Sequence, residues 1–294
     1  MRHALALAIA FVAARPVGAL AFVRSHVPNG GPALTWCSRD LSFITNENGS
    51  KTAGEGTFDA VARSFEAWSE PTCTDLTFEN QGTTSRTDVG YDPSRSDNIN
   101  LVIWREVSCA KAAPAGDSCL ENGGCNNKYN CWEYGSDAVD AIALTTTHYN
   151  TRTGEILDAD VEFNGAGFVF TAIDGPPCTT DNETSGTCVA NDIQNTLTHE
   201  VGHFIGLDHT PVPDATMYAK ADLGETKKRT LHQDDIDGLC TIYPKGLTTS
   251  TCAQAQKTQG SGCGQGPGGA PTIASLAVVP LAFRALRRRR SKSL

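Results

Sequence analysis

No stretch of this chain limits its fold as tightly as residues 199–209, which read His-Glu-Val-Gly-His-Phe-Ile-Gly-Leu-Asp-His. Upstream of them, Ile193 and Leu197 recur at helical spacing. Asn191 is placed to cap a helix there, and Gln194 follows three residues later, as in a capping box. The sequence therefore predicts a helix that carries the run at its C-terminal end.

Three histidines of this run are spaced so that they can meet at one point. His199 and His203 are four positions apart, so a helix presents both from the same face. Gly206 can adopt the left-handed conformation that ends a helix. The chain can then turn so that His209 approaches from outside the helix.

Three histidine ligands leave one position of a metal open to water, which is the arrangement of catalytic zinc. Glu200 follows the first ligand and could take a proton from a zinc-bound water, whose pKa the metal lowers to about 7, then pass it to a leaving amine. A chance match to five fixed positions is expected about once in ten thousand chains of this length. We therefore expect one catalytic zinc and a hydrolase of peptide bonds.

The run resembles the zinc signature HExxHxxGxxH of the metzincin peptidases. Met217, in Ala-Thr-Met-Tyr, lies eight residues after His209, which is similar to the Met-turn of the matrixin branch, the matrix-metalloproteinase-like family. Thr210 after the third histidine, and the segment 231–238, also look like that branch. The resemblance covers about residues 33–243.

This resemblance implies an α+β fold with a five-stranded, mixed, twisted sheet and three helices. The strand 141–149, which includes Thr145, would be the edge strand that pairs with substrate backbone. The segment that begins at Tyr218 would help to wall the pocket for the residue after the cut bond. The expected protein is a monomeric zinc endopeptidase that acts on protein or peptide substrates outside the cell, including extracellular matrix proteins.

The chain departs from animal matrixins in two respects. It has no Pro-Arg-Cys-Gly thiol switch, and outside the run its only histidines are His3, His26, His148 and His232. A second, structural zinc is therefore not expected, and His148 is expected to be an exposed strand residue. Calcium stays open.

Pattern and composition predict the remaining elements of the domain. Residues 58–68 have apolar positions at helical spacing before Pro71. Strands are expected at 33–45, 76–78, 99–104, 141–149 and 156–163, with a loop at 108–136. Alternation in the last strand places Asp158, Asp160 and Glu162 on one face. We expect that face to be solvated, although such carboxylates could hold calcium.

Eleven cysteines and an apolar N-terminus indicate export. Residues 1–21 read as a signal peptide, the alternative being a short buried helix. Ten cysteines can pair and one is left over. A zinc cluster is the alternative for Cys109, Cys119, Cys125 and Cys131, but none of these forms the CxxC pair that thiolate zinc sites favour.

Four regions are expected: the signal, a peptidase domain at 22–245, a flexible linker at 246–269 and a tail at 270–294. The tail is apolar and then rich in arginine. With Cys263 before it, it is similar to the C-terminal sorting tails of myxobacterial surface proteins, in which that cysteine would serve processing or lipid attachment. Attachment to the cell envelope would follow. A disordered basic tail is the alternative.

The net charge and the histidine run at 199–209 reduce the number of functions that the chain could have. The formal charge is −9, and the only cluster of Lys and Arg lies at the C-terminal end, which argues against a nucleic-acid partner. Three hypotheses remain: an active endopeptidase, an inactive surface binding or adhesion module on a metzincin scaffold, and a zinc hydrolase of other substrates. The presence of Glu200 beside all three histidines favours the first.

Overall fold

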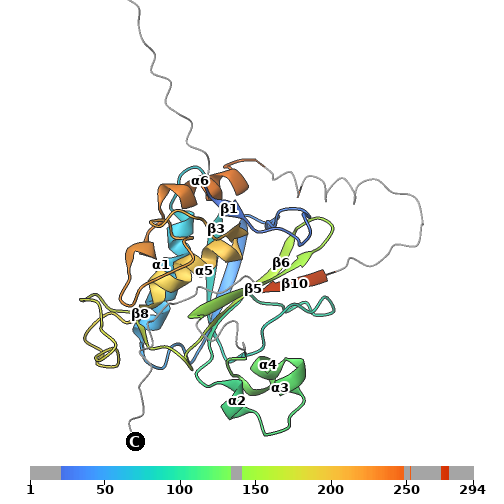
Figure 1. The fold of residues 1–294 in the computed structure, drawn as a ribbon. Helices are drawn as coiled ribbons and strands as arrows, with labels where there is room; N and C mark the ends of the chain where they lie inside the picture. Colours follow the sequence, from blue (N-terminus) through green and yellow to red (C-terminus); the bar gives the residue numbers. More distant parts are fainter. Residues whose placement is uncertain (1–20, 134–140, 248–251, 253–272, 278–294) are drawn as a thin grey trace, which may run out of the picture.

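The computed structural model describes residues 21–133, 141–247, 252 and 273–277. Its centre is a mixed sheet in the order β10-β5-β6-β4-β2-β3 (Figure 1). The strands β6, β4, β2 and β3 are parallel, whereas β5 and β10 run antiparallel to their neighbours. The bounds are β2 (Asp40–Asn46), β3 (Thr77–Thr84), β4 (Leu101–Trp104), β5 (Ala143–Asn150), β6 (Ile156–Phe163) and β10 (Ile273–Ala277). The predicted five-stranded sheet is confirmed, and β10 adds a sixth strand at its edge.

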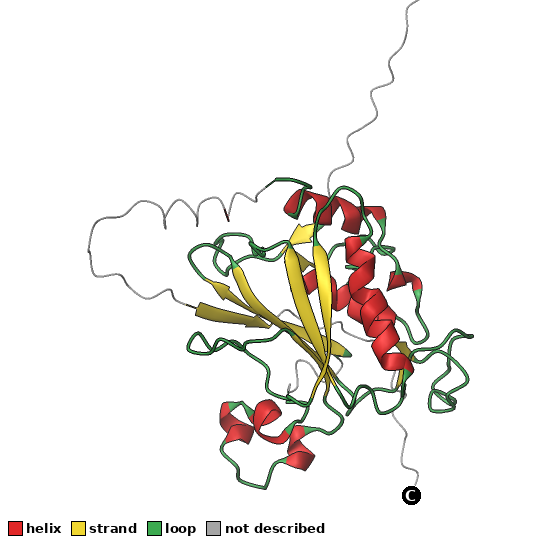
Figure 2. Cartoon of the chain, turned by 180° about the vertical axis from the view of Figure 1, so that it is seen from behind, coloured by secondary structure: helices red, strands yellow, loops and turns green. Residues whose placement is uncertain are grey.

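Two long helices, α1 (Gly56–Ser69) and α5 (Ile193–Phe204), pack together and cover one face of the sheet (Figure 2). The aromatic residues of α1 are core, as expected: the ring of Phe65 stacks on Phe43 of β2 with centroids 3.8 Å apart. Trp68 Nε1 donates to the carbonyl of Thr198 at 2.8 Å. This contact fixes α1 against the helix that carries the histidine run.

The third long helix is α6 (Gln233–Ile242), and the predicted α+β class with three such helices is confirmed. The segment expected as a loop at 108–136 contains three short helices, α2 (Cys109–Ala112), α3 (Cys119–Asn122) and α4 (Cys125–Tyr129), far from α6 in Figure 1. Minor elements are β1 (Val23–Arg24), β7 (Phe170–Thr171), β8 (Asn191–Asp192), β9 (Leu207–Asp208) and the 3-10 helix η1 (Lys227–Arg229). Within the described residues, every helix falls short of what a bilayer crossing requires.

The expected strand at 33–45 is wrong in its first half, because β2 begins only at Asp40. Residues before it pack on the end of α5 instead. Trp36 Nε1 donates to the carbonyl of Phe204 at 2.8 Å, and its backbone N–H donates to the hydroxyl of Tyr243 at 3.0 Å. The strand-like composition of residues 33–39 therefore belongs to a segment that packs against α5 and does not form a strand of the sheet.

The expected cap at Asn191 is also wrong, by one residue. Asp192 caps α5, and its carboxylate accepts from the backbone N–H of Asn195 at 2.7 Å. Asn191 belongs to β8, where its side chain donates to the carbonyl of Val169 at 2.8 Å. Arg229 holds the Asp192 carboxylate at 2.6 Å, which adds a charge-assisted bond at the helix start.

The carboxylates of β6 share one face as predicted, but the expectation that this face is solvated is wrong. Asp158, Asp160 and Glu162 are each about 1% exposed. Asp160 accepts from the backbone N–H groups of Gly90 and Leu101, at 2.6 and 2.8 Å. Burial and the neighbouring Asp158 raise the pKa of Asp160 well above its usual value. The calcium expectation stays a prediction.

His148 was expected to be exposed, and this is wrong. Its side chain is 13% exposed, and its Nδ1 lies 3.3 Å from a carboxylate oxygen of Asp158. Antiparallel pairing with β6 places the two residues directly opposite each other. The same covered face therefore accounts for the burial of both residues.

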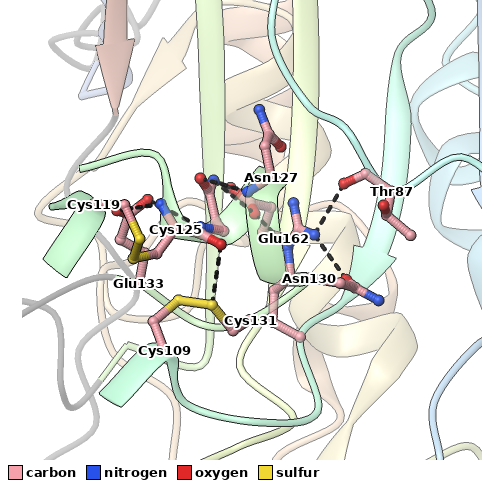
Figure 3. Close-up of a disulfide and its surroundings, with 11 residues drawn as sticks. Thr87, Cys109, Cys119, Cys125, Asn127, Asn130, Cys131, Glu133 and Glu162 are labelled. Carbon is pink, nitrogen blue, oxygen red and sulfur yellow. Dashed lines mark hydrogen bonds and ion pairs between the residues drawn. A yellow bond between two sulfur atoms is a disulfide. The ribbon is translucent and has the colours of Figure 1, made fainter. Parts of the chain in front are cut away.

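Five disulfides join ten of the cysteines, so the prediction that ten of them pair is confirmed. The pairs are Cys37–Cys252, Cys73–Cys240, Cys109–Cys131, Cys119–Cys125 and Cys178–Cys188. Figure 3 shows that the four cysteines for which a zinc cluster was the alternative form two disulfides, as expected. Cys252, within the predicted linker, is tied to Cys37. Cys263 and the predicted signal up to residue 20 lie outside the described residues.

Candidate metal centre

Helix α5 and the turn after it bring the histidine run together. His199 and His203 lie on α5, and the helix ends before Gly206, whose φ of +95° lies in the left-handed region. A Cβ at Gly206 would lie 2.5 Å from the carbonyl oxygen of Leu34, so both conformation and space require glycine there. The chain then leads through β9 to His209, as the sequence predicts.

The three imidazoles converge through one type of atom. The Nε2 atom of His199 lies 3.1 Å from that of His203 and 3.2 Å from that of His209, and the third distance is 3.2 Å. Nδ1 of His199 lies 2.6 Å from the carbonyl oxygen of Thr216, and Nδ1 of His203 lies 2.9 Å from that of Leu207. A carbonyl requires a donor, so in these two rings Nδ1 carries the proton and Nε2 has a lone pair.

Burial keeps these ligands neutral. It lowers the pKa of His203 to about 3 and the pKa of His199 well below its usual value, and it also lowers the pKa of His209. Lone pairs that face one another cannot hydrogen-bond, whereas a cation between them would satisfy all three. Tetrahedral zinc at 2.0–2.1 Å from each nitrogen places the nitrogens about 3.3 Å apart. The donor set therefore fits zinc.

The carboxylate of Glu200 is buried and only half engaged. The hydroxyl of Thr145 donates to its Oε2 at 2.6 Å, while Oε1 meets no hydrogen-bond partner among the described residues. Burial is the main cause that raises the pKa of Glu200 to about 7. Thr145 itself is fully buried on β5, so its hydroxyl fixes the orientation of the Glu200 carboxylate.

Met217 and Tyr218 lie in the segment that follows His209. Met217 is 2% exposed, and an added Cβ at Gly202 would lie 2.0 Å from its sulfur. The methionine thus packs directly beneath α5. Tyr218 is half-buried, and its carbonyl accepts from Lys228 Nζ at 2.7 Å.

Two residues of this region were missed by sequence reasoning. Lys228 is fully buried; its Nζ also donates to the carbonyl of Lys220 at 2.6 Å, and burial lowers its pKa to about 8. The carboxylate of Asp235 accepts from the backbone N–H groups of Thr216, Met217 and His232, at 2.7, 3.0 and 2.9 Å. Lys228 gave no sequence signal beyond a basic run. Asp235 could have been found as the third residue of a capping box that begins at His232.

Asp235→Ala is expected to lower the free energy of unfolding by about 3 kcal/mol or more. The two buried N–H groups of Thr216 and Met217 and the partly buried one of His232 lose their acceptor, and each buried group left unsatisfied costs about 1–3 kcal/mol. Urea unfolding measures the change. Asp237→Ala on the same helix is the matched control, because among the described residues the Asp237 side chain accepts a hydrogen bond only from the exposed side chain of Gln233, at 2.8 Å. Equal losses in the two variants would contradict this role of Asp235.

A helix with two histidines and a glutamate, a third histidine after a glycine turn and a methionine beneath them define the metzincin class of zinc peptidase domains. A family model described as Matrixin matches residues 35–244. The chain belongs to the matrixin family, whose members are zinc metalloendopeptidases.

Curated relatives match short segments. The chain is 36% identical over 63 residues to metalloendoproteinase 4-MMP of Arabidopsis thaliana, which covers 21% of this chain and 18% of the relative. It is 49% identical over 52 residues to human neutrophil collagenase, covering 18% of this chain and 11% of the relative. The chain is 36% identical over 62 residues to human matrilysin, and this match covers 21% of this chain and 23% of the relative. The matches thus span less than a quarter of each relative's length.

Proposed function

We propose that this chain is a zinc-dependent endopeptidase, secreted or attached to the cell surface, with His199, His203 and His209 as zinc ligands and Glu200 as the base. One observation carries the proposal: three Nε2 atoms, two from α5 and one from the segment after it, converge within 3.2 Å of one another, next to a buried and half-engaged carboxylate on the same helix. Membership of the matrixin family supports the reaction class.

The metal and the side chains around it have separate roles in the proposed reaction. Zinc, when bound, supplies the Lewis acidity that lowers the pKa of a water molecule and polarises a carbonyl. With a pKa of about 7, Glu200 can accept a proton from the attacking water and return it to the leaving amine. Thr145 holds Oε2, which leaves Oε1 for the water. Met217 supports the ligands from below α5.

The substrates we propose are extracellular proteins, including matrix proteins. Five disulfides favour an oxidising compartment, and residues 1–21 have the pattern of a signal peptide. The edge of β5 and the segment from Tyr218 would hold the substrate on either side of the cut bond. The tail at 270–294 would attach the protein to a bacterial envelope, in the manner of the myxobacterial tails it resembles.

The test is proteolysis with reversible removal of metal. We expect residues 22–294 to cleave casein or gelatin, to contain one zinc per chain by elemental analysis, and to lose activity in a chelator. Added Zn²⁺ should restore it. One bound zinc with intact casein, gelatin and peptide-library substrates would overturn the proposal in favour of an inactive binding module.

A further inference from the structure

The outer edge of β5 is covered by another part of the same chain. β10 pairs antiparallel with β5 over five residues, from Ile273 opposite Asn150 to Ala277 opposite Thr146 (Figure 1). The other edge of β5 pairs with β6. Without β10, β5 would end the sheet with a row of unpaired N–H and C=O groups.

The covered part of β5 leads directly to the candidate active site. Ala277 lies opposite Thr146, which is adjacent to Thr145, whose hydroxyl holds the Glu200 carboxylate. Successive residues of β10 pair with positions progressively nearer to Thr145. The tail strand therefore runs along the edge toward the metal centre.

An exposed sheet edge is also where an extended peptide adds as a further strand through main-chain hydrogen bonds. One edge has a single set of donors and acceptors, so two strands cannot occupy it together. We propose that the segment 273–277 is a built-in occupant of the β5 edge that competes with extended peptide substrates. This inference rests on the proposed function for its effect on catalysis, but the docking itself does not.

The attachment of the tail explains why a short strand can compete. The disulfide between Cys252 and Cys37 fixes one end of the tether to the domain. Only the 20 residues 253–272 separate it from Ile273. A short tether holds the segment beyond it at an effective concentration of up to about millimolar, so a strand with a millimolar intrinsic dissociation constant would be bound about half of the time. At that occupancy the contact would be reversible and would set a threshold for substrate.

Kinetics test the competition. We compare the full chain with a chain that ends at Gly262, which keeps Cys252, and with the full-length variant Ala274→Pro/Ser275→Pro. Alternate residues of an antiparallel strand donate to the partner, so two adjacent prolines remove at least one ladder donor. Both variants should lower KM for an extended peptide by about twofold or more, as release of a half-occupied edge requires, with unchanged kcat. Gln254→Pro/Ala255→Pro, in the tether, is the matched control and should leave KM unchanged.

A readout that needs no activity separates the two proposals. In a Glu200→Ala background, amide hydrogen exchange of residues 146–150 should be faster in the truncated and Ala274→Pro/Ser275→Pro chains than in the full chain. Equal exchange in all forms would overturn the docking, whatever the kinetics. Slower exchange in the full chain, together with no peptidase activity in the corresponding chains that keep Glu200, would support the docking and overturn only the proposed function.

Discussion

Glu200→Gln is expected to lower kcat/KM for a peptide substrate by about a thousandfold, within the range that a general acid–base group contributes. The amide has the shape of the carboxylate and can still accept from Thr145, but it cannot take a proton from water. The three histidines are unchanged, so one zinc per chain should remain. Initial rates with a fluorogenic peptide, together with elemental analysis, measure both quantities.

Thr145→Val is the matched control for this prediction. It removes the hydroxyl that orients the Glu200 carboxylate and leaves the base in place. We therefore expect a loss smaller than that of Glu200→Gln, again with zinc retained. Undiminished hydrolysis in Glu200→Gln with full zinc occupancy would exclude Glu200 as the base.

The second large effect is expected at a buried ion pair between β6 and the segment after β4. Arg105 Nε donates to Glu162 at 2.6 Å, and the two side chains are 0% and 1% exposed. Arg105 also donates to the carbonyl of Thr87 and to Asn130, which Figure 3 shows beside Glu162. Arg105→Met leaves the Glu162 carboxylate buried without its cation. We expect a loss of about 3–5 kcal/mol in the free energy of unfolding.

Urea unfolding measures this loss, and two further variants define it. Arg105→Met/Glu162→Gln removes the uncompensated charge and should recover part of the stability. Arg95→Met is the surface control, since Arg95 pairs with exposed Asp97 and Asp88, and exposed pairs contribute little. If Arg105→Met costs no more than Arg95→Met, the buried pair does not have the stabilising role assigned to it.

The convergence of the three histidines could be predicted because it depends on local sequence. The spacing of His199 and His203 on one helix and the need for glycine at 206 follow from backbone geometry, and His209 is only three residues beyond. The role of Lys228 could not be predicted. A lysine within a basic run is typical of a solvated surface, and its burial depends on carbonyls of Tyr218 and Lys220 that the chain folds around it.

The wrong prediction for the carboxylate face of β6 has the same cause, because contacts between segments far apart in the chain cannot be inferred from local sequence. Alternation in β6 correctly placed Asp158, Asp160 and Glu162 on one face, but it holds no information about what covers that face. The covering donors, such as Gly90 and Arg105, come from segments more than 50 residues away. β10 was missed for a related reason: a short apolar stretch after a glycine-rich segment gives no indication that a sheet edge is available to it.

The bond between Cys37 and Cys252 also bears on the order in which the protein matures. Its two cysteines are 215 positions apart and enclose nearly all of the residues that match the matrixin family, so this covalent ring cannot close until all of them have been synthesised. Once this disulfide has formed, a single cut in the chain between Cys37 and Cys252 leaves the two fragments covalently joined. The domain thus gains tolerance to a single cut within this ring, and gains it only after the chain has been synthesised as far as Cys252.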